Sequence, residues 1–211
     1  MISDKILKID ISKVANIDPA INVWNIFDSE HPPFIHGKRK TGEGMEPSII
    51  LYENSNMNVS YDTQKLPIFS FIKYKSLMIH IDNGDNSVTQ ISNFFGVMTL
   101  QRYSAQKINN NETTFRIQVF MYLHGFWYFL KPIIKSYLSR WIENTWVEDL
   151  SMKQRRDKFH KLGFKDMKGM PDDINDRNNT EEFKYKLPLI RVLDDCDSHP
   201  FAHKNHKKLF K

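Results

Sequence analysis

The chain has a single cysteine, Cys196, among its 211 residues. A disulfide within the chain is therefore excluded, and so is an iron–sulfur cluster held by several thiolates. The longest apolar stretch, residues 117–130, is interrupted by Gln118, His124 and Gly125. It is shorter than the roughly 18–20 apolar residues that a membrane-spanning helix needs. We therefore expect no membrane span and, because the N-terminus lacks the apolar core of a signal peptide, a cytoplasmic protein.

The excess of positive charge is small, since 30 Lys and Arg residues face 25 Asp and Glu residues for a net charge of +5. Much of it lies in residues 38–40 and in the tail from 204 to 211. These patches lack the aromatic interleaving of known nucleic-acid-binding modules, so nucleic acid is not an expected partner. A basic interaction module that uses these two patches is kept as a third hypothesis, behind the two developed below.

The length of the chain fits one domain with a sizeable core. Aromatic residues make up 13% of the sequence, and such side chains suit either a deep core or the wall of an apolar pocket. The composition changes to polar residues with Gly169 and Pro171 after Phe164. We therefore expect one domain over residues 1–164, followed by an extended tail over residues 165–211 that packs on the domain or trails from it.

The expected order of elements is a strand, a short helix, a sheet and a long helix. Residues 6–11 have a strand-like pattern, and Asp18-Pro19 favours the start of a short helix, with Asp18 as its N-cap. Six further strand-like runs are separated mostly by turn residues, which indicates an antiparallel sheet. These runs cover residues 48–52, 57–62, 67–73, 77–82, 94–103 and 113–123.

A long helix is expected over residues 129–162, because apolar side chains recur there at spacings of three and four. Gly163 suits its C-terminal cap. The order of elements resembles the START-like, or helix-grip, fold, an α+β fold in which a curved antiparallel sheet surrounds a long C-terminal helix. The resemblance implies a cavity between sheet and helix that takes an apolar small molecule. The predicted inward stripe of the helix is Leu130, Ile134, Tyr137, Leu138, Trp141 and Ile142.

A possible metal-binding motif follows the short helix, where Asp28, His31 and His36 stand in the spacing D-x2-H-x4-H. Pro32-Pro33 breaks the helix between the two histidines, so that both imidazoles can turn toward one ion. A carboxylate from elsewhere would complete a two-His-one-carboxylate site. Glu148 and Asp149 are the candidates, since they lie seven residues beyond Trp141 and Ile142 and so fall on or beside the inward stripe. The alternative for such an acid is a salt bridge to Arg155 or Arg156, or a position in water.

The histidine motif together with Glu148-Asp149 resembles the catalytic domain of Rieske-type aromatic-ring-hydroxylating oxygenases, within the START-like (SRPBCC) superfamily. The resemblance covers roughly residues 23–164. It implies that His31, His36 and Asp149 bind Fe(II), with zinc as the other candidate metal. It also implies that Asp28 orients a ligand histidine and helps to link the iron to the electron donor. The chain lacks the ligands of a Rieske domain, so electrons would come from a separate partner protein.

Two functions follow from this reading. The first is a non-haem iron oxygenase-type domain that acts on an apolar or aromatic small molecule. The alternative is a metal-free START-like protein that binds a hydrophobic ligand, or a polyketide cyclase-like protein, in which His31 and His36 are an ordinary polar helix end. His80 and His124 lie in strand-like segments and are candidates to line the cavity as donors or bases.

Overall fold

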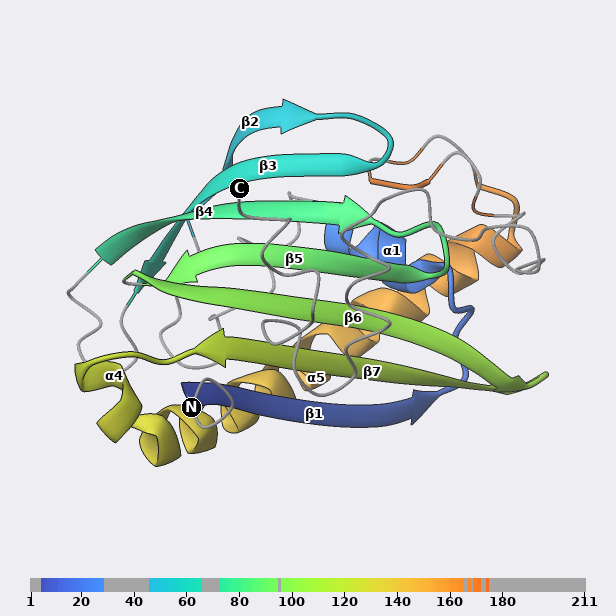
Figure 1. The fold of residues 1–211 in the computed structure, drawn as a ribbon. Helices are drawn as coiled ribbons and strands as arrows, with labels where there is room; N and C mark the ends of the chain where they lie inside the picture. The colour runs from blue at the N-terminus through green and yellow to red at the C-terminus, as the bar shows by residue number, and fades with distance from the viewer. Residues whose placement is uncertain are drawn as a thin grey trace.

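The computed structural model describes residues 5–28, 46–65, 73–94, 96–164, 167, 169–171 and 174. These residues form a seven-stranded antiparallel sheet and a long helix that crosses one face of it, as Figure 1 shows. The strands are β1 (Ile6–Ala15), β2 (Ile49–Glu53), β3 (Met57–Lys65), β4 (Lys73–Asp82), β5 (Ser87–Phe94), β6 (Val97–Asn109) and β7 (Glu112–Tyr122); the helices are α1 (Ile21–Phe27), α4 (Phe126–Phe129) and α5 (Lys131–Lys161).

The strand order is β1-β7-β6-β5-β4-β3-β2, so the first strand pairs with the last. Strands β2 to β6 each pair with the next along the chain, and β1 pairs with β7, with Ile6 opposite Tyr122. The chain then turns through α4 into α5, which returns across the sheet (Figure 1). The expected α+β architecture, a curved antiparallel sheet around a long C-terminal helix, is confirmed.

The first half of α5 packs on the edge of the sheet formed by β1 and β7. Side chains from alternate positions of these strands point to the same face, which puts Leu7 and Ile9 beside Val119 and Met121. Ile142 of α5 is 2% exposed against them, with Ile134 and Leu138 packed alongside. Each fully buried side chain of this kind stabilises the fold by about 1.5–3 kcal/mol.

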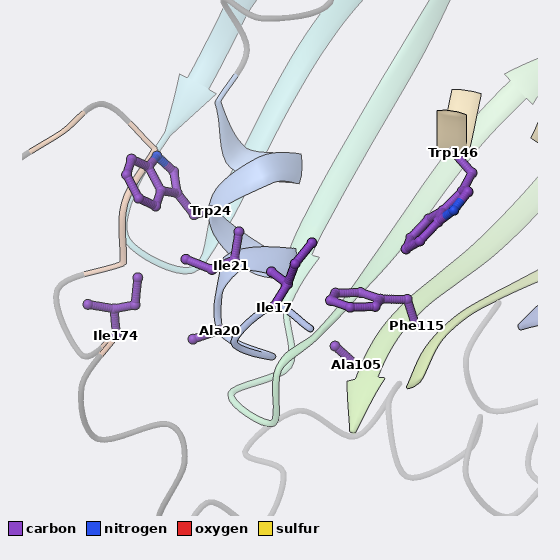
Figure 2. Close-up of a cluster of buried hydrophobic side chains, with 8 residues drawn as sticks. All are labelled: Ile17, Ala20, Ile21, Trp24, Ala105, Phe115, Trp146 and Ile174. Carbon is purple, nitrogen blue, oxygen red and sulfur yellow. The ribbon is translucent and has the colours of Figure 1, made fainter. Parts of the chain in front are cut away.

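A second apolar cluster holds α1 between the sheet and the later half of α5. Figure 2 shows Phe115 and Trp146 on one side of Ile17, with Trp24 and Ile174 on the other. The rings of Phe115 and Trp146 lie 5.4 Å apart, a distance that aromatic pairs favour. Ile174 belongs to the predicted tail and is nevertheless 2% exposed in this cluster. The start of that tail therefore contributes to the core, while the domain boundary at 164 stays a prediction.

The ends of the helices follow from local chemistry. Asp18 accepts a hydrogen bond of 2.9 Å from the N–H of Ala20, although α1 begins at Ile21, later than predicted. The expected cap at Gly163 is confirmed, since Gly163 has a φ of +80° and its N–H donates to the carbonyl of His160. The ring of the following Phe164 packs 5.3 Å from Phe159, the apolar contact that accompanies such caps.

Two sequence expectations differ from the structure, and a third lies almost wholly outside the described residues. The predicted run 94–103 is the end of β5 and most of β6, and β5 itself was not predicted. Tyr137 and Trp141, expected in the inward stripe, are 38% and 41% exposed. The run 67–73 lies outside the described residues except for Lys73. Within the described part of the chain, no helix has both the length and the hydropathy to cross a bilayer.

Candidate functional site

The buried face of α5 changes from apolar to charged halfway along the helix. Ile142 and Trp146 are followed inward by Asp149, Lys153 and Arg156, at spacings of three and four that keep one side of the helix toward the interior. Lys153 is 5% exposed and Arg156 is 4% exposed. Buried charges are costly unless they are paired, so their partners indicate what the interior is built to hold.

Arg156 is held by the end of α1. Its Nη1 donates to Oδ1 of Asn25 at 2.5 Å, and its Nη2 forms an ion pair with Oδ2 of Asp28. Its guanidinium also lies 5.4 Å from the ring centre of Trp24. The short helix ends at Phe27, and Asp28, with extended backbone, is its C-cap. Trp24, Asn25 and Asp28, at the end of α1, therefore all contact the guanidinium of Arg156 on α5.

Asn25 links this cation to a second acid. Its Nδ2 donates to Oδ2 of Asp149 at 3.1 Å, while its Oδ1 accepts from Arg156. Asn25 is 2% exposed, so the bonds replace those that water would otherwise make. We call the set Asp28, Arg156, Asn25, Asp149 and Lys153 the helix network.

Lys153 is the member of the helix network that lies in an aromatic environment. Its Nζ is 4.9 Å from the ring centre of Trp146 and 5.1 Å from that of Phe115. Burial lowers the pKa of the Lys153 amine; Asp149 opposes this change and Arg156 adds to it. The position therefore favours an amine that gives up its proton more readily than a surface lysine does.

A second set of polar side chains crosses the sheet on the face that α5 covers. His80, Gln90 and Gln101 stand opposite one another on β4, β5 and β6. Nε2 of His80 lies 3.2 Å from Oε1 of Gln90. The Tyr103 hydroxyl lies 2.8 Å from Oε1 of Gln101 and 3.2 Å from Oε1 of Gln90, so it donates its proton to one of the two amide oxygens. We call these four residues the sheet network.

The two networks meet at Tyr103 and Asp149. Burial raises the pKa of the Tyr103 phenol, and the nearby Asp149 carboxylate raises it further. Tyr103 therefore keeps its proton and remains a hydrogen-bond donor. Burial lowers the pKa of His80, against the opposing effects of Asp62 and of its hydrogen bond to Gln90, so His80 is neutral near pH 7.

The covered face of the sheet is thus divided into two halves. The half formed by β1 and β7 is apolar and packs against α5. The half formed by β3 to β6 is polar, although its side chains are buried. Besides the sheet network, it carries Ser60, Ser76, Ser92 and Thr99, all buried.

The structure tests the predicted site residues in part. Asp149 faces the end of α1, where its Oδ2 accepts a hydrogen bond from Asn25, and its charge opposes the lowering of the Arg156 pKa by burial. Asp28 pairs with Arg156. His31 and His36 lie outside the described residues, so their convergence on Asp149 stays a prediction. Among the described residues, no three His, Cys, Asp or Glu side chains are grouped closely enough to hold a metal ion.

The other candidates have mixed outcomes. His80 faces the interior, as its predicted place in the lining of the cavity requires. His124 is exposed in the turn after β7, with its ring 6.1 Å from that of Tyr122, so it does not line the interior. Residues 38–40 and 204–211, the two basic patches, lie outside the described residues.

Sequence reasoning missed Asn25, Lys153, Arg156 and Tyr103. A signal for the two cations was present, because they continue the spacing of Ile142, Trp146 and Asp149 on α5. A charged residue on a helix is, however, ordinarily expected to face solvent, so Lys153 and Arg156 were not placed in the interior. No pattern in the strand sequences indicated that Tyr103 would meet Gln90 and Gln101 in the interior.

A depression of about 310 Å³ lies elsewhere, lined by Tyr61, Tyr74, Lys75, Leu77, Asn93 and Gly96. Tyr61 and Leu77 stand opposite each other on β3 and β4. Leu77 is an odd number of positions from His80, so the two side chains point to opposite faces of the sheet. Most of the lining residues therefore lie on the face opposite the sheet network, although Tyr74 shares the face of His80, and we assign the depression no part in the site.

No protein family and no curated protein matches the sequence. Solved structures do match in fold. The Zhui aromatase/cyclase from Streptomyces sp. R1128 has a TM-score of 0.53 at 10% identity, over 73% of this chain and 94% of that chain. The di-domain ARO/CYC StfQ from the steffimycin biosynthetic pathway has a TM-score of 0.56 at 7% identity, over 76% of this chain and 53% of that chain.

A START superfamily protein from Mycobacterium smegmatis is also similar, with a TM-score of 0.46 at 11% identity, over 72% of this chain and 97% of that chain. Identities this low establish fold and not activity. The similarities give no support to the resemblance to Rieske-type oxygenases. Together with the strand order and the position of α5, they show that the chain has the START-like, helix-grip fold.

Proposed function

We propose that the protein binds a largely apolar small molecule with carbonyl or hydroxyl groups, between α5 and the covered face of the sheet, as a START-like binding or cyclase-type protein. The observation that carries the proposal is the buried polar half of that face. A merely structural interior would be expected to be apolar there, because a buried polar group that lacks a partner costs about 1–3 kcal/mol.

The division of the face indicates the class of ligand. Met78, on the polar half between Ser76 and His80, and the rings of Phe115 and Trp146 beside Lys153 suit a hydrocarbon or aromatic frame, and the polar side chains suit oxygen substituents. Tyr103 supplies a donor that stays protonated, and the amides of Gln90 and Gln101 supply donors and acceptors. A polyketide-type aromatic molecule has both features, in keeping with the similarity in fold to aromatase/cyclases.

The same residues provide the groups that a cyclase-type reaction needs. Closing a carbon ring on a chain with several carbonyls requires a base that removes a proton from carbon and a donor that protonates the carbonyl oxygen as the C–C bond forms. Lys153, whose pKa is lowered by burial, is our candidate base in its neutral form. Tyr103 is our candidate donor, and it recovers its proton from solvent when the product leaves.

Ligand binding tests the proposal directly. Binding of 1,8-dihydroxyanthraquinone would be measured by fluorescence quenching and native mass spectrometry, with anthracene as the probe that lacks oxygen. We expect Tyr103→Phe to weaken binding of the dihydroxy compound about fivefold, the equivalent of one neutral hydrogen bond. Tyr61→Phe, on the opposite face of the sheet, is the matched control and should bind as the parent does. Equal binding by the parent and Tyr103→Phe, or no binding of either probe by folded protein, would contradict the proposal.

A second candidate function is the iron site of His31, His36 and Asp149. One observation favours it: Asp149 faces the end of α1, from which the chain continues to both histidines. The described residues supply only one of the three ligands, and the neighbouring Lys153 and Arg156 disfavour a divalent cation. For this reason we rank the iron site second. Bound Fe(II) would supply oxidative chemistry, with electrons from a separate protein.

Metal analysis separates the two candidates. Protein made without a His-tag in iron-supplemented medium would be measured for iron and zinc by mass spectrometry. The iron site requires about one metal per chain, and a loss of that metal in His31→Ala with the fold intact. A chain without metal removes this second candidate and leaves the binding proposal untouched.

A further inference from the structure

The outer side of α4 and of the first turns of α5 carries a line of large apolar side chains in contact with solvent. Phe126 is 69% exposed, Phe129 77%, Ile133 58%, Tyr137 38% and Trp141 41%. Successive members are three or four residues apart, so the line runs along one side of the helices. We call these five residues the aromatic stripe.

The stripe is not the side of the helix that packs on β1 and β7, and of its members Tyr137 lies near a strand residue, Tyr74 of β4. Ile134, Leu138 and Ile142 already cover the apolar cluster on β1 and β7. The first half of α5 is therefore apolar on two sides, and the fold buries only one of them. Figure 1 shows α4 and the start of α5 at one end of the molecule, extending beyond the strands. A contiguous exposed apolar surface of this size is typical of an interaction site.

The charges around the stripe identify the kind of partner. Between residues 126 and 142 the charged residues are Lys131, Lys135 and Arg140, with no acid among them. The next acid, Glu143, forms an ion pair of 2.5 Å with Lys13 of β1. Exposed Phe, Tyr and Trp side chains with only basic neighbours are the composition of helices that lie in the headgroup region of a membrane. A second copy of the chain would bring like charges together, which disfavours self-association through this face.

We propose that the aromatic stripe docks on an anionic lipid surface, with α4 and the first turns of α5 lying in its interfacial layer. The apolar side chains enter the headgroup boundary, and the basic residues meet the lipid phosphates. The length and position of these helices fit attachment to one leaflet, since no helix among the described residues can span a bilayer. The proposal is independent of what binds between the sheet and α5.

Co-sedimentation with vesicles tests the docking. The full chain would be mixed with vesicles of phosphatidylcholine alone or with 30% phosphatidylserine, at 0.1 M and at 0.5 M NaCl. We expect binding to the anionic vesicles, a decrease at high salt because charge attraction is screened, and a blue shift in tryptophan fluorescence. The double variant Phe129→Asp/Ile133→Asp should lose at least tenfold in partition coefficient. Ile108→Asp, at an exposed apolar position on β6, should bind as the parent does.

A second variant, Lys135→Glu/Arg140→Glu, tests the charge contribution without altering the apolar side chains. It should lose binding to anionic vesicles while circular dichroism and unfolding midpoint stay unchanged. Equal binding to neutral and anionic vesicles, or binding by the aspartate double variant equal to that of the parent, would overturn the proposal. Lipid-independent dimers that depend on Phe129 and Ile133 would also overturn it and assign the face to a second copy.

Discussion

The side-chain amide of Asn25 donates a hydrogen bond of 3.1 Å to the carboxylate of Asp149, between residues 124 positions apart in the sequence. The same amide accepts from Arg156. Its oxygen and nitrogen are therefore assigned by their partners, the nitrogen toward the carboxylate and the oxygen toward the guanidinium. One short side chain on α1 thus keeps an acid and a cation of α5 in place.

Replacing Asn25 by Leu should destabilise the protein by about 2 kcal/mol or more, because a buried carboxylate and a buried guanidinium each lose a hydrogen bond. Urea unfolding, followed by circular dichroism, measures the effect. Gln154→Ala, at an exposed position on α5, is the control and should change stability little. An unchanged midpoint for Asn25→Leu would mean that the helix network does not contribute to the fold.

Lys153 should make stability depend on pH in the alkaline range. Burial lowers its pKa in the folded protein below the ordinary value of 10.5, so between the two values the unfolded chain binds more protons than the folded one. Stability then rises with pH across that interval. We expect the stability of the parent relative to Lys153→Gln to increase from pH 7 to pH 10, in urea unfolding at each pH. The exposed Lys158→Gln should show no such trend, and a flat difference for Lys153→Gln would contradict the burial of a titrating amine.

His80 should have a corresponding effect on the acidic side. Burial lowers its pKa below 6.5, so below that value the unfolded chain takes up a proton that the folded protein resists. The parent should therefore lose stability as pH falls from about 6.5, and His80→Gln should lose less over the same range. The comparison uses urea midpoints at pH 7.5 and pH 5, with the exposed His124→Gln as control. Parallel losses in the parent and His80→Gln would show that His80 is not the responsible group.

Gly169 is predicted to tolerate no side chain. A Cβ at this position would lie 2.6 Å from the backbone nitrogen of Asp28, and the residue has a φ of +72°. Gly163 has a similar φ of +80° but open space around its missing Cβ. Gly163→Ala should therefore cost only the backbone strain, about 1 kcal/mol, and Gly169→Ala should cost clearly more, because the end of α1 must move. Equal unfolding midpoints for the two variants would mean that residue 169 does not pack on Asp28.

Local patterns in the sequence were enough to predict the fold class. The alternation of residues in the strands, the turn residues between most of them and the apolar spacing of the long helix act over a few residues, so they can be read without the tertiary structure. Strand β5 was not predicted. Thr89 and Gln90 point to its two faces and are both buried and polar, so the strand lacks the alternation of apolar and polar residues by which strands are recognised. The same polar residues of β5 belong to the candidate site.

The sequence by itself determined the order of strand, short helix, sheet and long helix and the cap at Gly163, and it placed Asp149 on or beside the inward stripe, because each depends on near neighbours in the chain. Only the tertiary structure decided which groups from other elements meet Asp149. Lys153 is near it simply because it lies four residues further along α5, whereas Asn25 comes from α1 and Tyr103 from β6, and nothing in their spacing along the chain encodes their proximity to Asp149. Their meeting depends on the curvature of the sheet and on the angle at which α5 crosses it, and both result from packing over the whole molecule.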